Sequence, residues 1–226
     1  MAGNSPISAE ELEQRLPEWM AKAGVPGLGI ALVRGGEVVW CRGFGVERTD
    51  NRQPVSERTV FEACSLSKPI FAHAVVKLCQ QGRLDLDAPL SGFLEAPYIA
   101  DEPRLVRISA RQVLSHTAGF ANWRPEGGRL QVHLEPGTRF AYSGEGFLYL
   151  QRVVETVVGK PGEEWIQESL LGPLGMKDSS FVWRGQEEKP LATGHDEEGR
   201  PVAKQGWPEM NAACSLHTTA ADFARF

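Results

Sequence analysis

The stretch SLSKPIFAHAVVKLCQQG, residues 65–82, decides how this chain folds. Apolar side chains recur in it at helical spacing, at positions 70, 71, 74, 75, 78 and 79, and a glycine stands at position 82, just where helices commonly end. The spacing predicts a helix that buries one face and begins close to Ser65. Pro69 disfavours helical backbone at Lys68, so we expect the first turn to be tight or irregular.

Ser65 and Lys68 are three residues apart, a spacing that places two side chains on the same face of a helix. A serine hydroxyl is a weak nucleophile on its own, and a lysine one turn away can act as its base or supply a positive field. The N–H groups and the macrodipole at a helix N-terminus also favour negative charge. Two interpretations follow: a serine nucleophile activated by Lys68, or a simple N-cap followed by a surface lysine.

Composition places few limits on the class of protein. The 226 residues are enough for one large domain or two small ones. A net charge of -5, without a block of basic residues, argues against nucleic acid or an anionic membrane as a partner. The first six residues do not resemble a signal peptide, and no apolar run is long enough to span a bilayer, so we expect a cytoplasmic location.

The metal-ligating residue types are scattered. Neither the four cysteines nor the five histidines show the spacing of a zinc site or of a disulfide framework, so no metal and no cofactor are expected. Cys64, beside Ser65, has two interpretations: a thiol nucleophile or a small buried hydrophobic residue. The second is favoured, because free cysteines are commonly buried.

The N-terminal part combines a helix with a hairpin. Ser8 and Glu11 have the spacing of a capping box, and the apolar positions 12, 16, 19, 20 and 23 predict one buried face, with a kink at Pro17. The runs 28–34 and 37–42 flank Gly35-Gly36, which is a strong signal for a β-hairpin. Residues 43–60 are polar and rich in turn formers.

The remainder up to Met176 is mainly helical in pattern. Ser109 and Gln112 form a second capping box, an apolar period over 147–158 closes at Gly159, and a further helix is expected over 163–171. Residues 184–209 are polar and without a clear period. The last nine residues begin a capped helix of under two turns, which is marginal without packing, so we expect the chain to be part of a longer protein.

Five stretches, in the same order along the chain, resemble the serine β-lactamase-related family. This family includes class C β-lactamases, D-alanyl-D-alanine peptidases, and esterases and acyltransferases of the same fold. The matching stretches are Ser65-Leu66-Ser67-Lys68, Leu114-Ser115-His116-Thr117-Ala118-Gly119, Tyr142-Ser143-Gly144, Pro173-Leu174-Gly175-Met176 and 218–226.

The resemblance implies an α/β fold with an antiparallel sheet flanked by helices, a largely helical inserted domain, and an active site in the cleft between them. On this basis residues 1–226 are one domain. Residues 1–62 supply the N-terminal helix and hairpin, 63–183 the mainly helical part, and 184–226 an incomplete return segment.

The resemblance also implies roles for individual residues. Ser65 would be the acylated nucleophile, Lys68 its activator, and Tyr142 the group that relays protons to Ser65 and the leaving group. Chemically this is reasonable, because an ammonium near a tyrosine favours the phenolate, which can accept the serine proton. Taken alone, a tyrosine before a helix such as Tyr142 would by default be a core or surface aromatic; its position in a loop and its pairing with Ser65 and Lys68 favour the catalytic role. His116 is interpreted as a hydrogen-bonding structural residue rather than a base.

This sequence departs from the family pattern at two places. The second motif usually ends in asparagine, whose amide can bind a substrate amide, but here Gly144 takes its place and favours an ester substrate. Gly144 is a candidate substrate-binding residue, and so is Trp123 in the loop before it, although an aromatic in a loop more often packs on its own neighbours than on a ligand. The family's third motif, Lys or His followed by Ser/Thr and Gly on a late strand, is not found in these residues, so the sheet is expected to have an open edge.

Three hypotheses follow. The first is a serine hydrolase, an esterase or acyl transferase, that forms an acyl-enzyme on Ser65 from a small-molecule ester. The second is β-lactamase or D-alanyl-D-alanine peptidase activity on an amide. The third, of a different class, is a non-catalytic truncated relative that binds an acyl ligand or a partner. The oligomeric state is not indicated by these residues.

Overall fold

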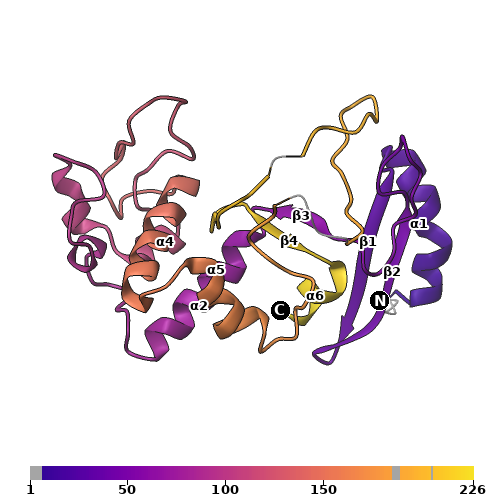
Figure 1. Ribbon diagram of the computed structural model, residues 1–226, viewed down its shortest axis with the longest axis horizontal. Coiled ribbons are helices and arrows are strands. Elements are labelled where there is room, and N and C mark those ends of the chain that lie inside the picture. The colour runs from indigo at the N-terminus through magenta and orange to yellow at the C-terminus, as the bar shows by residue number, and fades with distance from the viewer. Residues whose placement is uncertain (1–6, 185–188, 205) are drawn as a thin grey trace, which may run out of the picture.

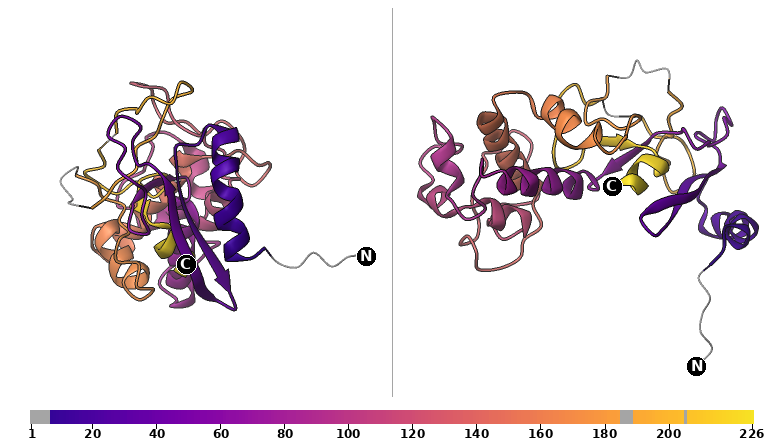
Figure 2. Two further views of the ribbon diagram at one scale, coloured as in Figure 1. Left: turned by 90° about the vertical axis from the view of Figure 1, so that its right-hand side faces the viewer. Right: turned by 90° about the horizontal axis from the view of Figure 1, so that it is seen from below.

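The computed structural model describes residues 7–184, 189–204 and 206–226. The molecule is elongated, with the helical part at one end and the N-terminal helix α1 (Ala9–Ala23) at the other, beside the hairpin of β1 (Gly27–Arg34) and β2 (Glu37–Gly45) (Figure 1). A second pair of strands, β3 (Phe61–Cys64) and β4 (Leu216–Thr218), lies between these two ends. The same arrangement is visible from below in the right-hand view of Figure 2.

The N-terminal helix, α1 (Ala9–Ala23), has the cap that the sequence predicted: Ser8 Oγ accepts a hydrogen bond from the Glu11 N–H at 3.1 Å. Its buried residues are Leu12, Leu16 and Met20. The prediction that Trp19 shares this buried face is wrong, because its side chain is 42% exposed and lies beside the Arg15 guanidinium. The helix is continuous through Pro17.

The predicted hairpin consists of β1 (Gly27–Arg34) and β2 (Glu37–Gly45), which pair antiparallel. Gly35 and Gly36 both have positive φ, 60° and 82°, which matches the tight turn of a two-residue hairpin. The hairpin is positioned between two helices, with α1 packed against β2 and α6 (Ala220–Arg225) packed against both strands (Figure 1).

Sequence reasoning did not find the second pair of strands, β3 (Phe61–Cys64) and β4 (Leu216–Thr218). They pair antiparallel, with Phe61 opposite Thr218 and Cys64 opposite Leu216. Each is too short to show a recognisable alternation of apolar and polar residues. Their pairing nevertheless brings the C-terminal segment next to the turn that contains Ser65.

The helical part is built on α2 (Ser67–Gln80) and α4 (Gly144–Val158). Around them lie α3 (Ala110–Leu114), α5 (Gly162–Ile166) with a π-helical turn at Gln167–Leu171, and the short 3-10 helices Leu90–Phe93 and Pro103–Arg107. As predicted, α2 buries Ile70, Phe71, Ala74, Val75 and Leu78, and these residues belong to one continuous core with α4. This core is the support on which the candidate site is built.

Several helix ends lie where the sequence predicted them. Ser109 and Gln112 form the predicted capping box at the start of α3, and Gly159 ends α4 with a left-handed φ of 74°. A Thr219 cap begins α6. Local signals therefore determined where these helices start and stop.

Within the described residues, β1 pairs with β2 and with no other strand. A hollow of about 490 Å³ lies beside it, lined mainly by apolar residues of β1, β3 and α6. No helix in the described part of the chain is both long and apolar enough to cross a bilayer.

Candidate active site

Ser65 lies in the turn between β3 and α2, and its side chain is exposed. The chain is redirected at Cys64, whose φ of 45° is in the left-handed region. The Lys68 N–H bonds to the Ser65 carbonyl at 3.1 Å, three residues back, so the first turn is as tight as Pro69 predicted. The N-cap position falls on Leu66, so the interpretation of Ser65 as a simple N-cap is wrong.

Ser67 anchors this turn to the C-terminal segment. Its fully buried hydroxyl donates to the Cys64 carbonyl at 2.6 Å and accepts from the Leu216 N–H at 2.9 Å. Both bonds are made from one side chain, so Ser67 links β3, β4 and the start of α2. Sequence reasoning assigned it no role, because nothing local distinguishes this serine from its neighbours.

A Ser67→Ala variant is expected to lower the free energy of unfolding by about 1–3 kcal/mol, because a buried N–H and a buried carbonyl lose their partner. The measurement is urea unfolding followed by circular dichroism. Ser169→Ala is the matched control, since the Ser169 hydroxyl is buried without a hydrogen-bond partner among the described residues. Equal midpoints for Ser67→Ala and wild type would contradict the anchoring role.

Lys68 is buried, with only 6% of its surface exposed. Its ammonium donates to Ser65 Oγ at 3.1 Å and to the Ala213 carbonyl at 2.8 Å. The same nitrogen lies 4.7 Å from the centroid of the Tyr142 ring. Lys68 therefore points at the serine hydroxyl and at the tyrosine together, and it is not the surface lysine of the alternative interpretation.

The Ala213 carbonyl is held in place by α4. Gln151 Oε1 accepts from the Ala212 N–H at 2.8 Å, and Gln151 Nε2 donates to the Met210 carbonyl at 3.0 Å. These bonds fix the turn that presents the Ala213 carbonyl to Lys68. No sequence signal could have identified Ala213, because a main-chain carbonyl carries no side-chain signature.

Tyr142 stands directly before α4, as the sequence placed it, and is 39% exposed. Partial burial opposes ionisation of its hydroxyl. Hydrogen bonding to Lys68 and Ser65, together with the Lys68 charge, outweighs that effect and holds the pKa of Tyr142 below its ordinary value of 10.0. The three residues predicted to be catalytic are thus brought together.

Trp123 packs directly on Gly144. A Cβ atom added to Gly144 would lie 2.5 Å from Trp123 Cη2, so the indole ring occupies the space where any larger side chain would begin. Asn122 Oδ1 accepts from the Gly144 N–H at 3.0 Å and ties the two segments together. The structure therefore brings the two predicted substrate-binding residues into contact, next to Tyr142.

An ion pair between the exposed Arg124 and the buried Glu145 holds the Trp123 loop. Arg124 donates from Nε to Glu145 Oε1 at 2.8 Å and from its second nitrogen to Oε2 at 2.6 Å. Burial disfavours the carboxylate, but the hydrogen bonds and charge of Arg124 outweigh it and hold the pKa of Glu145 below its usual range. Two parallel hydrogen bonds of this kind fix the orientation of the guanidinium relative to the carboxylate, and so they hold the loop in one position.

His116 also contacts this group. Its Nδ1 accepts from the Ser143 N–H at 3.1 Å, and its ring lies 4.5 Å, centroid to centroid, from that of Tyr142. The hydrogen-bonding role predicted for His116 is confirmed.

The prediction of a buried Cys64 is wrong, since its side chain is exposed. Desolvation and the Glu62 carboxylate raise the pKa of the Cys64 thiol, which makes it a poor nucleophile.

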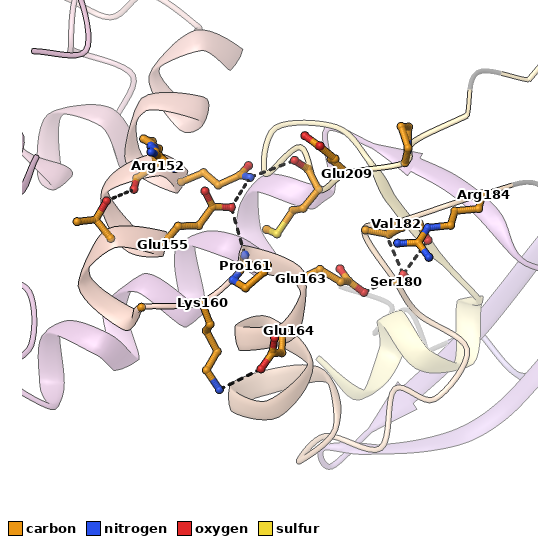
Figure 3. Close-up of a pocket in the computed structure, with 16 residues that line it drawn as sticks. Arg152, Glu155, Lys160, Pro161, Glu163, Glu164, Ser180, Val182, Arg184 and Glu209 are labelled. Atoms are coloured by element: carbon orange, nitrogen blue, oxygen red, sulfur yellow. Dashed lines mark hydrogen bonds and ion pairs between the residues drawn. The ribbon is translucent and has the colours of Figure 1, made fainter. Parts of the chain in front are cut away.

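A second hollow, of about 900 Å³, lies between α4, α5 and the segments 180–184 and 208–210 (Figure 3). Ser65, Lys68 and Tyr142 are not among the residues that line it. Several of its charges already have partners: Lys160 pairs with Glu164 at 3.4 Å, and Glu155 accepts from the Gly162 N–H at 3.1 Å. The described residues contain no group of three His, Cys, Asp or Glu that could hold a metal. The candidate active site is therefore placed at Ser65.

Comparison with known proteins gives a consistent result. The family described as Beta-lactamase matches residues 12–226. Protein flp of Staphylococcus aureus (strain N315) is 26% identical over 222 residues, which cover 90% of this chain and 44% of that protein. Esterase EstB of Burkholderia gladioli is 28% identical over 223 residues, covering 86% of this chain and 56% of the esterase. The chain thus spans about half the length of the curated relatives it matches.

Among solved structures, a class C beta-lactamase superposes with a TM-score of 0.82 at 26% identity. The match covers 95% of this chain and 62% of that one. The fold that the sequence resemblance implied is thereby confirmed.

Proposed function

Because this chain belongs to the beta-lactamase family of serine hydrolases, we propose that it hydrolyses small-molecule esters, or transfers their acyl groups, through an acyl-enzyme on Ser65. One observation carries the proposal: Lys68 Nζ lies 3.1 Å from Ser65 Oγ, beside a tyrosine whose pKa is lowered by those two residues. This arrangement provides an exposed nucleophile, a buried positive charge next to it, and a partly exposed base.

In the proposed acylation step, the Tyr142 phenolate accepts the proton of Ser65 while Oγ bonds to the ester carbonyl carbon. The carbonyl oxygen becomes negative and faces the Ser65 N–H, which has no acceptor among the described residues, and the start of α2. The tetrahedral intermediate then collapses, the alkoxide leaves with the proton from Tyr142, and Ser65 is acylated. Lys68 stays an ammonium and stabilises the phenolate throughout.

Deacylation reverses these roles. Tyr142 accepts a proton from water, the hydroxide bonds to the acyl carbon, and Ser65 leaves as it regains the proton from Tyr142. An alcohol in place of water gives acyl transfer. The exposure of Ser65 and Tyr142 leaves room for either acceptor.

The contact between Trp123 and Gly144 supports an ester rather than an amide. In the family pattern an asparagine amide at position 144 binds the substrate amide, but here the indole ring fills that space. An ester leaving group requires less assistance than an amine. The name of the Burkholderia gladioli relative, an esterase, supports the same preference.

The test compares hydrolysis of p-nitrophenyl butyrate and of the β-lactam nitrocefin by the purified chain, with Ser65→Ala as the blank. We expect ester turnover to exceed β-lactam turnover. In a Trp123→Ala/Gly144→Asn double variant, the restored amide should raise the ratio of β-lactam to ester kcat/KM by roughly 3- to 10-fold, the value of one hydrogen bond. Trp123→Ala alone is the control and should leave this ratio unchanged.

The second candidate is β-lactamase activity, which the similarity to a class C beta-lactamase favours. Nitrocefin turnover without ester turnover in the wild-type chain would support it and overturn the ester preference. Turnover of neither substrate by a folded chain would favour the non-catalytic hypothesis.

A further inference from the structure

His116 is in contact with the chain on both sides of Tyr142. Its carbonyl accepts from the Ala141 N–H at 2.7 Å, and its Nδ1 accepts from the Ser143 N–H at 3.1 Å. The residues before and after Tyr142 are therefore bound to one and the same residue. This contact determines the backbone position of Tyr142.

The imidazole ring also limits where the phenol can point. It lies 4.5 Å from the Tyr142 ring at an interplanar angle of 32°, and 5.4 Å from the Phe147 ring of α4. The φ of 56° at His116 turns its backbone so that carbonyl and ring both face the segment 141–143. Because the left-handed region disfavours most side chains, this conformation is held by the surrounding hydrogen bonds.

We infer that His116 is a positioning residue for Tyr142, and that it acts only in its neutral form, with the proton on Nε2. The inference rests on the proposed role of Tyr142 as the base. A neutral imidazole has one nitrogen free to accept a hydrogen bond, whereas a protonated imidazole donates from both. Protonation of His116 would therefore break the bond from Ser143 and release Tyr142 from its position.

The surroundings of His116 favour the neutral form at neutral pH. Of the described residues, the charged group that acts on it is Lys68 of α2, and the titratable group in contact with it is Tyr142. Desolvation and the Lys68 charge hold the pKa of His116 below its ordinary value of 6.5. The neutral form therefore predominates at pH 7, and it is lost as the pH falls through the pKa of His116.

Two variants separate the acceptor from the ring. His116→Asn keeps an acceptor close to the place of Nδ1, cannot be protonated, and tolerates a positive φ. His116→Gly tolerates the same φ without strain but has no acceptor. His116→Asn should therefore restore the hydrogen bond that His116→Gly loses, and neither variant introduces backbone strain.

The first readout is the ionisation of Tyr142, followed by absorbance at 295 nm, and it does not require turnover. The chain has three tyrosines. Burial raises the pKa of Tyr98, and it raises that of Tyr149 to about 12, whereas the pKa of Tyr142 is lowered, so Tyr142 should ionise first. Tyr142→Phe identifies its contribution. We expect His116→Asn to keep the low pKa of Tyr142 and His116→Gly to raise it towards 10. The same pKa of Tyr142 in all three proteins would overturn the inference.

The second readout is the pH dependence of kcat/KM for p-nitrophenyl butyrate between pH 5 and 9. Above the pKa of His116, only protonation of Tyr142 lowers kcat/KM, by about tenfold per pH unit. Below that pKa His116 is protonated as well, so kcat/KM of the wild type should fall by about a further tenfold per pH unit. His116→Asn should show no such steepening. A merely structural histidine would change the height of the profile but not its slope, so equal slopes in both proteins would refute the inference. If the wild type shows no turnover, the ester hypothesis fails and the absorbance titration decides on His116.

Discussion

A Ser65→Ala variant is expected to lose ester turnover by roughly three to six orders of magnitude, because a methyl group cannot bond to the acyl carbon. Its folding should be nearly unchanged. The Ser65 side chain is exposed, and Lys68 keeps its bond to the Ala213 carbonyl at 2.8 Å after the hydroxyl is removed. The substitution therefore tests chemistry separately from stability.

The measurement is intact mass after incubation with a fluorophosphonate, which bonds to activated serines. The wild-type chain should gain a single adduct and Ser65→Ala none. Ser115→Ala is the matched control, an exposed serine at the end of α3 that should leave the adduct unaffected. An adduct that persists in Ser65→Ala, or equal turnover in both proteins, would show that the nucleophile is elsewhere. A folded wild-type chain without an adduct would favour a binding role.

A Tyr142→Phe variant is expected to lose turnover by about 10²- to 10⁴-fold, the usual effect of removing a general base. Phenylalanine keeps the ring that contacts His116 and Lys68, so packing should be conserved. The pKa of Tyr142 is lowered from 10.0, which means that more of it is phenolate at any pH below that value. Wild-type activity should therefore rise with pH and level off before pH 10.

This rise should be absent from Tyr142→Phe when kcat/KM is followed from pH 6 to 10. Tyr98→Phe is the control, because burial raises the pKa of Tyr98 and its loss should not alter the profile. Full activity in Tyr142→Phe would eliminate Tyr142 as the base and leave Lys68 as the group that activates Ser65.

Much of the candidate site could be predicted because its residues carry recognisable side chains at characteristic spacings. Ser65 and Lys68 are three residues apart, and Tyr142 directly precedes an apolar helical period. The roles assigned to these residues remain predictions until the variants are measured. Their proximity, by contrast, is a finding of the structure, with Lys68 between Ser65 and Tyr142.

Predictions of burial were less successful for residues at the edge of an element. Trp19 fits the apolar period of α1 but lies exposed, because the hairpin covers only part of that face. Cys64 is exposed because the left-handed turn at this residue ends β3. Periodicity identifies a face, but only the neighbouring element decides how much of that face is covered.

The sequence by itself determined the elements that depend on local interactions. These are the capped helices α1, α3, α4 and α6, the glycine turn of the hairpin, and the apolar face of α2. Such features depend on residues a few positions apart, and their signals can be recognised directly in the chain. Only the tertiary structure decided the pairing of β3 with β4, the bond from Lys68 to the Ala213 carbonyl, the contact of Trp123 with Gly144, and the hold of His116 on Tyr142. These contacts join distant segments, in most cases through main-chain groups that every residue has, so no side-chain pattern reveals them before the chain has folded.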